Sequence, residues 1–442
     1  MSRNQTVVPG LYSFTELFIE SIKPDGSSLY VDLLPLLENA SIQSSINSKT
    51  ITIALAVADS AGIFENMYLA GDEHIIASWK TPEYHGETKE RKIAFRITKI
   101  GPLTLNTLSD TSIFSISGIS ELAYVQSFAS IDNYFSDSID KCVRNVFDRA
   151  TEKADELNKP LYFNDNSKIT ITKTNGVADF IIPSETPFDA MDYFASWAHL
   201  GEDKTNLFFF FQDLEGYNFK ALDALMYDVG QVDTSANKDL LYNFSGGDAA
   251  KATVTNPQVA NQRIVSFNQI NRSSLFEYAE KGSIHNTVAA VDYFNKSVER
   301  KSLRIMDNGF NDGFAPNALS NLLLSEDFLK TFGKDSNSTD WLYLNKGAVN
   351  YIDTTDSHLH KKIYGAVYFN NLIQIKIPGN SNLDVGQGIY LNIATIDFTT
   401  KEKGPDPYLS GRFLIKDILH SFTSATYYQT IICSRLGGYS GA

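Results

Sequence analysis

The residues best placed to do chemistry are two aspartates and two histidines in one short stretch: Asp353, Asp356, His358 and His360. On a β-strand, a His-x-His run directs both imidazoles to one side, where they can chelate a metal ion such as zinc. No further ligand follows at a firm spacing, and two lysines come directly after the second histidine. We therefore expect no metal site in this stretch.

Two other histidines have structural explanations. His199 ends a run with a helical pattern, and a cation there would stabilise the negative end of the helix dipole, so we expect it to cap that helix. His420 follows an apolar strand run and is expected to satisfy hydrogen bonds at the end of a β-barrel. Neither histidine is predicted to be catalytic.

Signatures of common enzymes are missing from the sequence. No glycine-rich phosphate loop leads from a strand into a helix, and we expect Gly437 and Gly438 to belong to a flexible tail. Ser60 lacks the flanking glycines of a nucleophile elbow. Carboxylates are abundant, but no helper motif selects a pair for glycoside hydrolysis. The sequence therefore predicts a protein that is not an enzyme, with no catalytic residues, no cofactor and no metal.

The composition is typical of a soluble, multidomain globular protein. With 442 residues, of which 43% are hydrophobic and 20% charged, the chain exceeds one ordinary core and is neither disordered nor membranous in composition. The formal net charge of −14, without a long basic cluster, argues against tight binding to a phosphate backbone. We find no signal peptide and no membrane-spanning run. Whether Cys142 and Cys433 pair is left open, although such sparse cysteine use fits a reducing cytoplasm.

The elements that must position any site are mostly β-strands. Near the C-terminus four runs alternate apolar and polar residues between glycine and proline turns: Leu372–Pro378, Ile389–Ile393, Arg412–Phe422 and Tyr427–Arg435. A side-chain period of two predicts consecutive antiparallel strands. Because open edges invite unwanted pairing, we expect these strands to form a small β-barrel.

The first part of the chain, from Leu11 to about Ser127, is predicted to be a second barrel of the same type. Its strand runs match the C-terminal runs in order and in spacing: 74–79 with 389–393, 92–100 with 412–419, and 113–117 with 430–434. This similarity favours one barrel type used twice in the chain. The alternative is that any two β-domains give such matches by chance.

The middle of the chain changes character. Residues 136–158 repeat apolar positions every three or four residues, which indicates an amphipathic helix. Thr186 followed by Pro187 marks the start of another helix, and 207–219 is typical of a strand, a turn and a return strand. These patterns predict a small α/β domain.

The predicted fold class is mainly β with an α/β portion, that is, a multidomain α+β protein. It should contain two tube-like antiparallel β-barrels, a small α/β domain and an insertion. The insertion is polar and irregular apart from a short helix near 316–331. The expected domains are a first barrel (1–127), the α/β domain (128–226), a connector with the first strands of the second barrel (227–300), the insertion (301–361) and the remainder of the second barrel (362–442).

The last two strand runs carry a more specific pattern. Within 413–422, alternating apolar residues end in His-x-aromatic, and 428–432 has the pattern Tyr-x-Thr-x-Ile. This resembles the last hairpin of the central baseplate hub proteins of contractile-tailed phages, the T-even and late-control hub family. The helix and apolar strand that end in Gln212, Asp213 and a glycine turn are similar to the family's second domain.

The resemblance implies a structural virion protein, a homotrimeric ring at the centre of the tail baseplate. Each chain would bring two tube-like barrels, so that three chains present six similar units to the sixfold tail tube, while the other end holds the threefold cell-puncturing spike. The implied partners are the spike or needle protein and the tail tube or tube-initiator proteins. Tape-measure protein and DNA would pass through the lumen without specific binding. The implied location is the virion tail baseplate, assembled in the host cytoplasm, although related injection systems use similar hubs.

Two functions of other classes stay open. An adhesin-like, receptor- or carbohydrate-binding tail protein would line a groove with some of its 22 tyrosines and bind as a monomer or an independent trimer. A hydrolase would depend on one pair of its many carboxylates, and substituting one of them would abolish a measurable activity.

Overall fold

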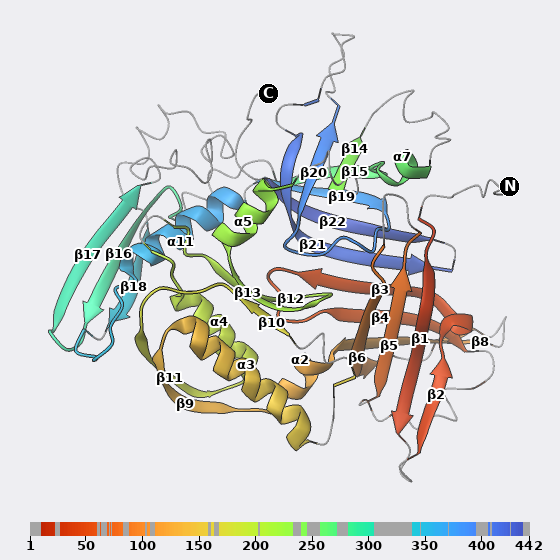
Figure 1. Cartoon of the computed structure of the whole chain (residues 1–442), viewed down its shortest axis with the longest axis horizontal. Helices are drawn as coiled ribbons and strands as arrows, with labels where there is room; N and C mark the ends of the chain where they lie inside the picture. Colours follow the sequence, from red (N-terminus) through yellow and green to blue (C-terminus); the bar gives the residue numbers. More distant parts are fainter. Residues whose placement is uncertain are drawn as a thin grey trace.

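The computed structural model describes most of the chain (Figure 1). The described residues are 10–22, 27–59, 62, 69, 71, 73–82, 88–101, 104–106, 111–157, 161–162, 168–201, 204–232, 240–244, 257–271, 282–304, 338–344, 346–369, 371–394, 405–406, 409–424 and 426–435. The helix predicted near 316–331 lies outside them.

Strands dominate the structure, as the alternating sequence pattern predicts. Among the described residues fourteen strands join into one sheet, whose main path is β15-β19-β22-β21-β3-β4-β8-β6-β5-β1-β2. The strands from the first half of the chain are β1 (Ser13–Ile22), β2 (Ser28–Asp32), β3 (Leu37–Ser45), β4 (Thr52–Asp59), β5 (His74–Lys80), β6 (Arg91–Ile100), β7 (Thr104–Asn106) and β8 (Thr111–Ser120). Those from the second half are β14 (Leu241–Phe244), β15 (Ser266–Asn271), β19 (Leu372–Pro378), β20 (Gly388–Ile393), β21 (Gly411–Thr423) and β22 (Tyr427–Arg435).

The two halves share this sheet instead of forming two separate barrels. Strand β21 pairs antiparallel with β3, and Figure 1 shows the blue strands β21 and β22 lying above the red strand β3. The path of paired strands is open at both ends, so no closed barrel is found among the described strands. Of the predicted fold, the mainly β class with a large, mostly antiparallel sheet is confirmed, but the two separate tube-like barrels are not found among these strands. The physical reason is the length of β21: β20 covers only the start of its 13 residues, and the rest accepts β3.

The α/β part lies between the two halves in the sequence. It contains α2 (Glu121–Gln126), β9 (Ile131–Asp137), α3 (Ile139–Glu156), β10 (Ile169–Ile171), β11 (Ala178–Glu185), α4 (Pro187–Trp197), β12 (Phe208–Asp213), β13 (Gly216–Ala221) and α5 (Leu222–Gly230). The predicted amphipathic helix is α3, which buries Val143, Val146 and Ala150 on one face. The predicted helix start is also confirmed, because the Thr186 side chain accepts a hydrogen bond from the Asp189 backbone N–H.

A separate three-stranded sheet follows β15 in the chain. Its strands are β16 (His285–Asp292), β17 (Ser297–Arg304) and β18 (Ser338–Leu344), and helix α11 (Thr355–Tyr368) packs against β16 and β17. The three strands lie at the far left of Figure 1, away from the large sheet, and α11 runs from them toward the centre of the molecule. The expectation that the stretch before Lys362 is irregular is wrong for α11, because Leu359 and Ile363 give it a buried stripe at helical spacing.

The structure answers the question that the sequence left open about the cysteines. Cys142 and Cys433 are both free and buried, so they do not form a disulfide. No helix in the described ranges is long and apolar enough to cross a membrane. The remaining short helices are η1 (Leu34–Leu36) and α7 (Pro257–Asn261).

Candidate assembly interface

The His-x-His run does not form a chelating pair. The geometry that lets a strand chelate through this pattern does not apply, because both histidines are in α11, where side chains two positions apart point about 160° away from each other. His358 Nε2 lies 3.6 Å from Asp340 Oδ2, whereas His360 Nδ1 lies 3.3 Å from the carbonyl oxygen of Lys204. The two imidazoles therefore serve different contacts.

The two aspartates of the same stretch pair with a lysine. Lys301 Nζ lies 3.1 Å from Asp356 Oδ2 and 3.8 Å from Asp353 Oδ2, which ties β17 to α11. In the part of the chain that the structure describes, no group of three or more metal-ligating side chains comes together. These residues hold the insertion together.

The cation at the end of α4 is a lysine of α11. Lys361 Nζ donates hydrogen bonds to the carbonyl oxygens of Ser196, at 2.5 Å, and Ala195, at 3.3 Å. Burial lowers the pKa of Lys361 to about 7. His199 lies beyond the end of the helix, where burial and the nearby Lys361 lower its pKa. The predicted cap role of His199 is therefore taken by Lys361, which docks α11 onto α4.

A backbone ladder between two strands joins the two halves of the chain. Seven consecutive register positions pair β21 with β3, from Asp417 opposite Ser45 to Thr423 opposite Asn39. Backbone ladders of this kind are directional and fix the register to one residue. The chain therefore contains one complete example of how one half attaches to the other.

The two halves are built alike around this ladder. Strand order and pairing correspond, with β3, β4, β5, β6 and β8 matching β15, β19, β20, β21 and β22. Both halves also carry the same β-bulge: β6 skips Thr98 in its pairing with β8, and β21 skips Lys416 in its pairing with β22. Since a bulge inserts one residue at a defined place in a ladder, its repetition fixes which strands of the two halves correspond.

An aromatic cluster fills the space beneath the ladder. The ring of Phe422, on β21, lies 4.4 Å from that of Tyr427 and 4.9 Å from that of Phe14, measured between centroids. Tyr12 and Trp79, from the first half, lie 5.3 and 5.6 Å from the same ring. Aromatic contacts of this kind add to the free energy of burying the rings, so the core of the first half is completed by the second.

His420 lies within the same ladder, opposite Ile42. Its Nδ1 is 2.7 Å from the Tyr427 hydroxyl and 3.3 Å from Nε2 of Gln429. Burial, with a smaller effect from the charge of Arg91, lowers the pKa of His420 to about 3, so the ring is neutral. Burial also raises the pKa of Tyr427, which keeps its proton. The tyrosine hydroxyl and the glutamine amide therefore donate to Nδ1, and the prediction that His420 satisfies hydrogen bonds holds for that nitrogen.

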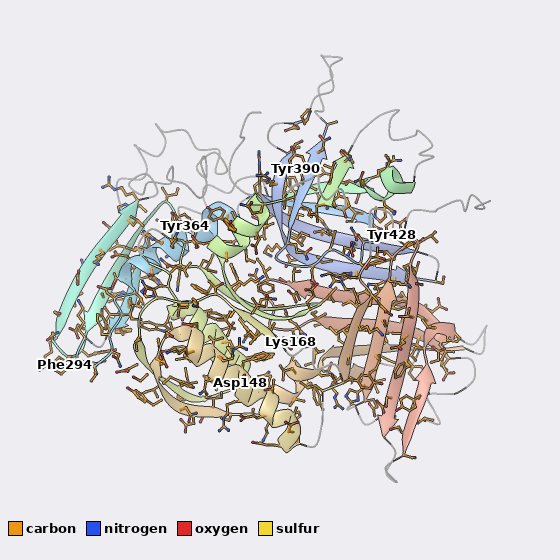
Figure 2. The ribbon with its side chains drawn as sticks, in the orientation of Figure 1. Asp148, Lys168, Phe294, Tyr364, Tyr390 and Tyr428 are labelled. Atoms are coloured by element: carbon orange, nitrogen blue, oxygen red, sulfur yellow. The ribbon has the colours of Figure 1, made fainter. Side chains whose placement is uncertain are left out.

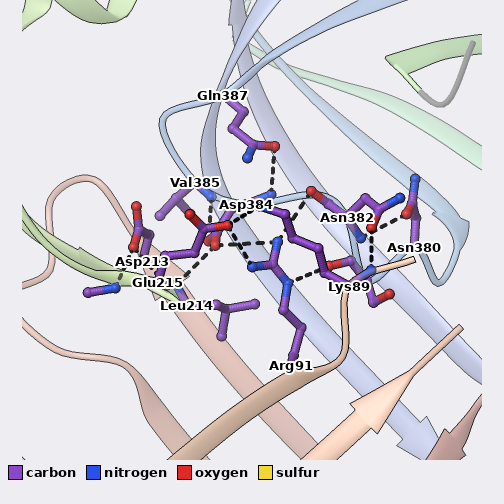
Figure 3. A network of polar contacts seen from close by, with 12 residues as sticks. Lys89, Arg91, Asp213, Leu214, Glu215, Asn380, Asn382, Asp384, Val385 and Gln387 are labelled. Carbon is purple, nitrogen blue, oxygen red and sulfur yellow. Dashed lines mark hydrogen bonds and ion pairs between the residues drawn. The ribbon is translucent and has the colours of Figure 1, made fainter. Parts of the chain in front are cut away.

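A buried arginine joins the first half to the loop between β19 and β20 (Figure 3). Arg91, at the start of β6, is 3% exposed. Its guanidinium donates to the carbonyl oxygens of Ser381, at 2.5 Å, and Asn382, at 3.3 Å, and its Nη2 lies 3.8 Å from Asp384 Oδ2. Its Nη1 also donates to Glu215 Oε1 at 3.1 Å, so the α/β part meets both halves here.

Two carboxyl groups belong to this junction, the buried Asp384 and the half-buried Asp213. Burial raises the pKa of both side chains, and the negative charge of Asp213 adds to the effect at Asp384. Asp384 Oδ2 accepts from the Leu214 backbone N–H at 3.0 Å, and Asp213 Oδ1 accepts from the N–H groups of Glu215 and Gly216. Both carboxyl groups therefore accept hydrogen bonds from backbone N–H groups, which is a structural role at the contact between parts of the chain.

No family model matches this sequence, and no curated protein matches it. The structure is similar to the crystal structure of the 43 kDa tail protein of prophage MuSo2 from Shewanella oneidensis, with a TM-score of 0.53 and 11% identity over 95% of this chain and 98% of that chain. The tail protein from Neisseria meningitidis MC58 matches with a TM-score of 0.49 and 8% identity, over 95% of this chain and 97% of that one. At such low identity the similarity concerns the fold alone, and we base the fold assignment on the Shewanella protein. The chain therefore has the fold of a prophage tail protein.

Proposed function

We propose that this chain is a structural virion protein that forms the central hub of a contractile tail baseplate. The observation that carries the proposal is the repeat within one chain: two five-strand units with the same order and the same bulge, joined edge to edge by β21 and β3. The fold shared with a prophage tail protein supports it.

In this proposal three copies form a ring. A chain with two similar units gives six of them in a homotrimer, which matches a sixfold tail tube on one side while leaving threefold symmetry for a spike or needle protein on the other. The tube or tube-initiator proteins and the spike are the proposed partners. Tape-measure protein and DNA would pass through the lumen, and the net charge of −14 would keep DNA from adhering to it.

The proposed action is mechanical and needs no turnover. The polar groups described above are engaged in joining parts of the chain: Arg91 to backbone carbonyls, Asp384 to a backbone N–H, and Lys361 to the end of a helix. We propose a protein without enzymatic activity, located in the virion tail.

The test is the solution mass of the purified chain by light scattering, together with negative-stain imaging. A trimeric ring with an open centre and sixfold modulation is expected, and it should bind purified tail tube and spike proteins of the same system. A chain that stays monomeric at high concentration, even with those proteins added, would overturn the proposal.

A second candidate is a receptor- or carbohydrate-binding tail protein, and one observation favours it. Trp341 and Tyr343 are more than half exposed on one face of β18, and the Tyr293 ring stacks on that of Tyr343 with 5.5 Å between centroids. Exposed aromatic rings on a sheet face are common binding surfaces. Saturable glycan or receptor binding that is lost in Trp341→Ala, by a chain that forms no ring, would favour this candidate over the hub.

A further inference from the structure

Each strand of the internal ladder between β21 and β3 has a counterpart whose equivalent edge pairs with no other described strand. By strand correspondence, the counterpart of β3 is β15 and the counterpart of β21 is β6 together with β7. Strand β15 pairs with β19 along one edge, and none of the described strands lies along its other edge. Strand β7 pairs with β8 and with no other described strand.

Strand β7 continues β6 along β8 in the way that the end of β21 runs along β22. The Gly101 N–H donates to the Ser115 carbonyl oxygen at 2.5 Å, between the two strands, and pairing resumes with Thr104 opposite Ile113. In the second half, the residue at the position of Thr104 is Ser421, opposite Tyr428. The edge of β21 that pairs with β3 therefore corresponds to the edge formed by β7 and by the end of β6 that does not pair with β5.

The edge of β15, which pairs with no other described strand, lacks the features that usually prevent edge-to-edge association. Residues 266–271 contain no charged residue and no proline, like residues 39–45 of β3, which the chain does pair. Residues 104–106 of β7 are likewise uncharged and free of proline, whereas Lys99 of β6 and Pro102 precede them in the sequence. Exposed edge strands in soluble proteins are normally protected by charges, by proline or by a cover. Val265, directly before β15, and Ile270, within β15, are about half exposed. The edge of β15 therefore has the composition of an interface, and β7 shares that composition over residues 104–106.

We propose that β15 of one copy pairs antiparallel with β6 and β7 of the next copy, reproducing between chains the ladder that β3 and β21 form within one. The inference rests on the proposed ring and names the surface that closes it. An interface made from two different edges is heterologous, and such interfaces generate rings when the rotation closes. The large sheet would then continue through every copy, alternating internal and intermolecular ladders.

The internal ladder predicts the register of the intermolecular one. Ser421 lies opposite Ser41, and Thr423 lies opposite Asn39. The equivalents of Ser421 and Thr423 are Thr104 and Asn106, by their pairing with β8 and β22.

The equivalents of Ser41 and Asn39 follow from the partners of β3 and β15. They are Asn268 and Ser266, by their pairing with β4 and β19. Thr104 of one copy should therefore lie opposite Asn268 of the next, and Asn106 opposite Ser266.

The test is a disulfide between copies. Residues directly opposite in an antiparallel ladder have Cα atoms about 4.5–5.5 Å apart, within the range of about 4.4–6.8 Å that a disulfide spans. We expect the double variant Asn106→Cys with Ser266→Cys to give covalent trimers under mild oxidation, as judged by denaturing non-reducing gels. A second matched pair is Thr104→Cys with Asn268→Cys.

A mismatched pair sets the background. Asn106→Cys with Gln269→Cys places the second thiol three residues along the strand, on its other face, and should stay monomeric on the gel. The native cysteines are both buried and stay in place. A ring seen by light scattering and imaging, with no cross-link or with equal cross-linking in the mismatched pair, would overturn the strand pairing and leave the hub function standing. Absence of any ring would overturn the hub function itself.

Discussion

The ring of Phe422 lies 4.9 Å from the ring of Phe14, so a strand near the C-terminus completes the core that the first strand of the chain begins. Phe422 is 1% exposed and packs among residues of β1, β5 and β22. The two halves are therefore joined by a shared core as well as by a backbone ladder. Joints of this kind keep two units in a fixed relative orientation, which a ring built from repeated units requires.

Replacing Phe422 with alanine should weaken both halves together. Removing a buried phenylalanine costs about 3–5 kcal/mol, through lost burial and the cavity that remains. We expect a decrease of that size in the free energy of unfolding, measured in urea by tryptophan fluorescence, to which Trp79, Trp197 and Trp341 all contribute. Phe128→Ala, at a site where the side chain is 57% exposed, is the matched control and should change stability by less than about 0.5 kcal/mol. Equal effects of the two variants would contradict a shared core.

Replacing Arg91 with methionine should loosen the junction shown in Figure 3. Methionine keeps part of the apolar stem but removes the donors to Ser381 and Asn382 and the charge beside Asp384. Breaking one partner of a buried charged pair costs about 3–5 kcal/mol. The measurement is urea unfolding, with hydrogen exchange of the loop at 380–387 as a local readout. Lys92→Met, at the next and exposed position, should leave that exchange unchanged.

Much of the strand content could be predicted from the sequence because each strand buries one face. Turns without glycine or proline are harder to place. Between β3 and β4 the chain turns where Ser45 Oγ accepts from the Asn47 N–H, and Ser48 Oγ donates to the Thr50 carbonyl oxygen. Side-chain hydrogen bonds of serine can replace glycine in a turn, and no periodicity reveals them.

The repeat was predictable in order but not in register. The matched runs placed Ile113 with Thr430, whereas the ladders place Ile113 with Tyr428, two residues away. A period of two leaves such a shift invisible in the sequence, and only the bulge at Thr98 and Lys416 fixes it. The contacts of Arg91 join positions about 290 residues apart, and no local pattern carries that information.

Replacing Gly379 with alanine should disturb the junction from the side of the loop. A Cβ at this position would lie 1.9 Å from the ring of Tyr427, which is fully buried and cannot turn away. Overpacking of a filled core costs about 1–3 kcal/mol. Thermal unfolding should therefore start at a lower temperature. Gly230→Ala, in helix α5, where a Cβ would meet nothing within 4 Å, should not lower the transition temperature. A normal transition for the Gly379 variant would show that Tyr427 moves without cost.

Replacing His420 with asparagine should make the protein less sensitive to acid. The pKa of the folded ring is lowered to about 3, mainly by burial, whereas the unfolded ring binds a proton near its ordinary pKa of about 6.5. Between these values the unfolded state holds one more proton, so stability is complete above pH 6.5 and falls as the pH drops towards 3. This group alone contributes a slope of about 1.4 kcal/mol per pH unit in that window.

Asparagine can present an acceptor near the position of Nδ1 to the Tyr427 hydroxyl, but it does not titrate. Urea unfolding at pH 7, 6, 5 and 4 should therefore show a shallower decline for His420→Asn than for the natural chain, with the two curves separating below pH 6. The control His360→Asn changes a partly exposed ring on α11 and should follow the natural chain. Parallel curves for His420→Asn and the natural chain would mean that the ladder opens enough to let the folded ring take up its proton at an ordinary pH.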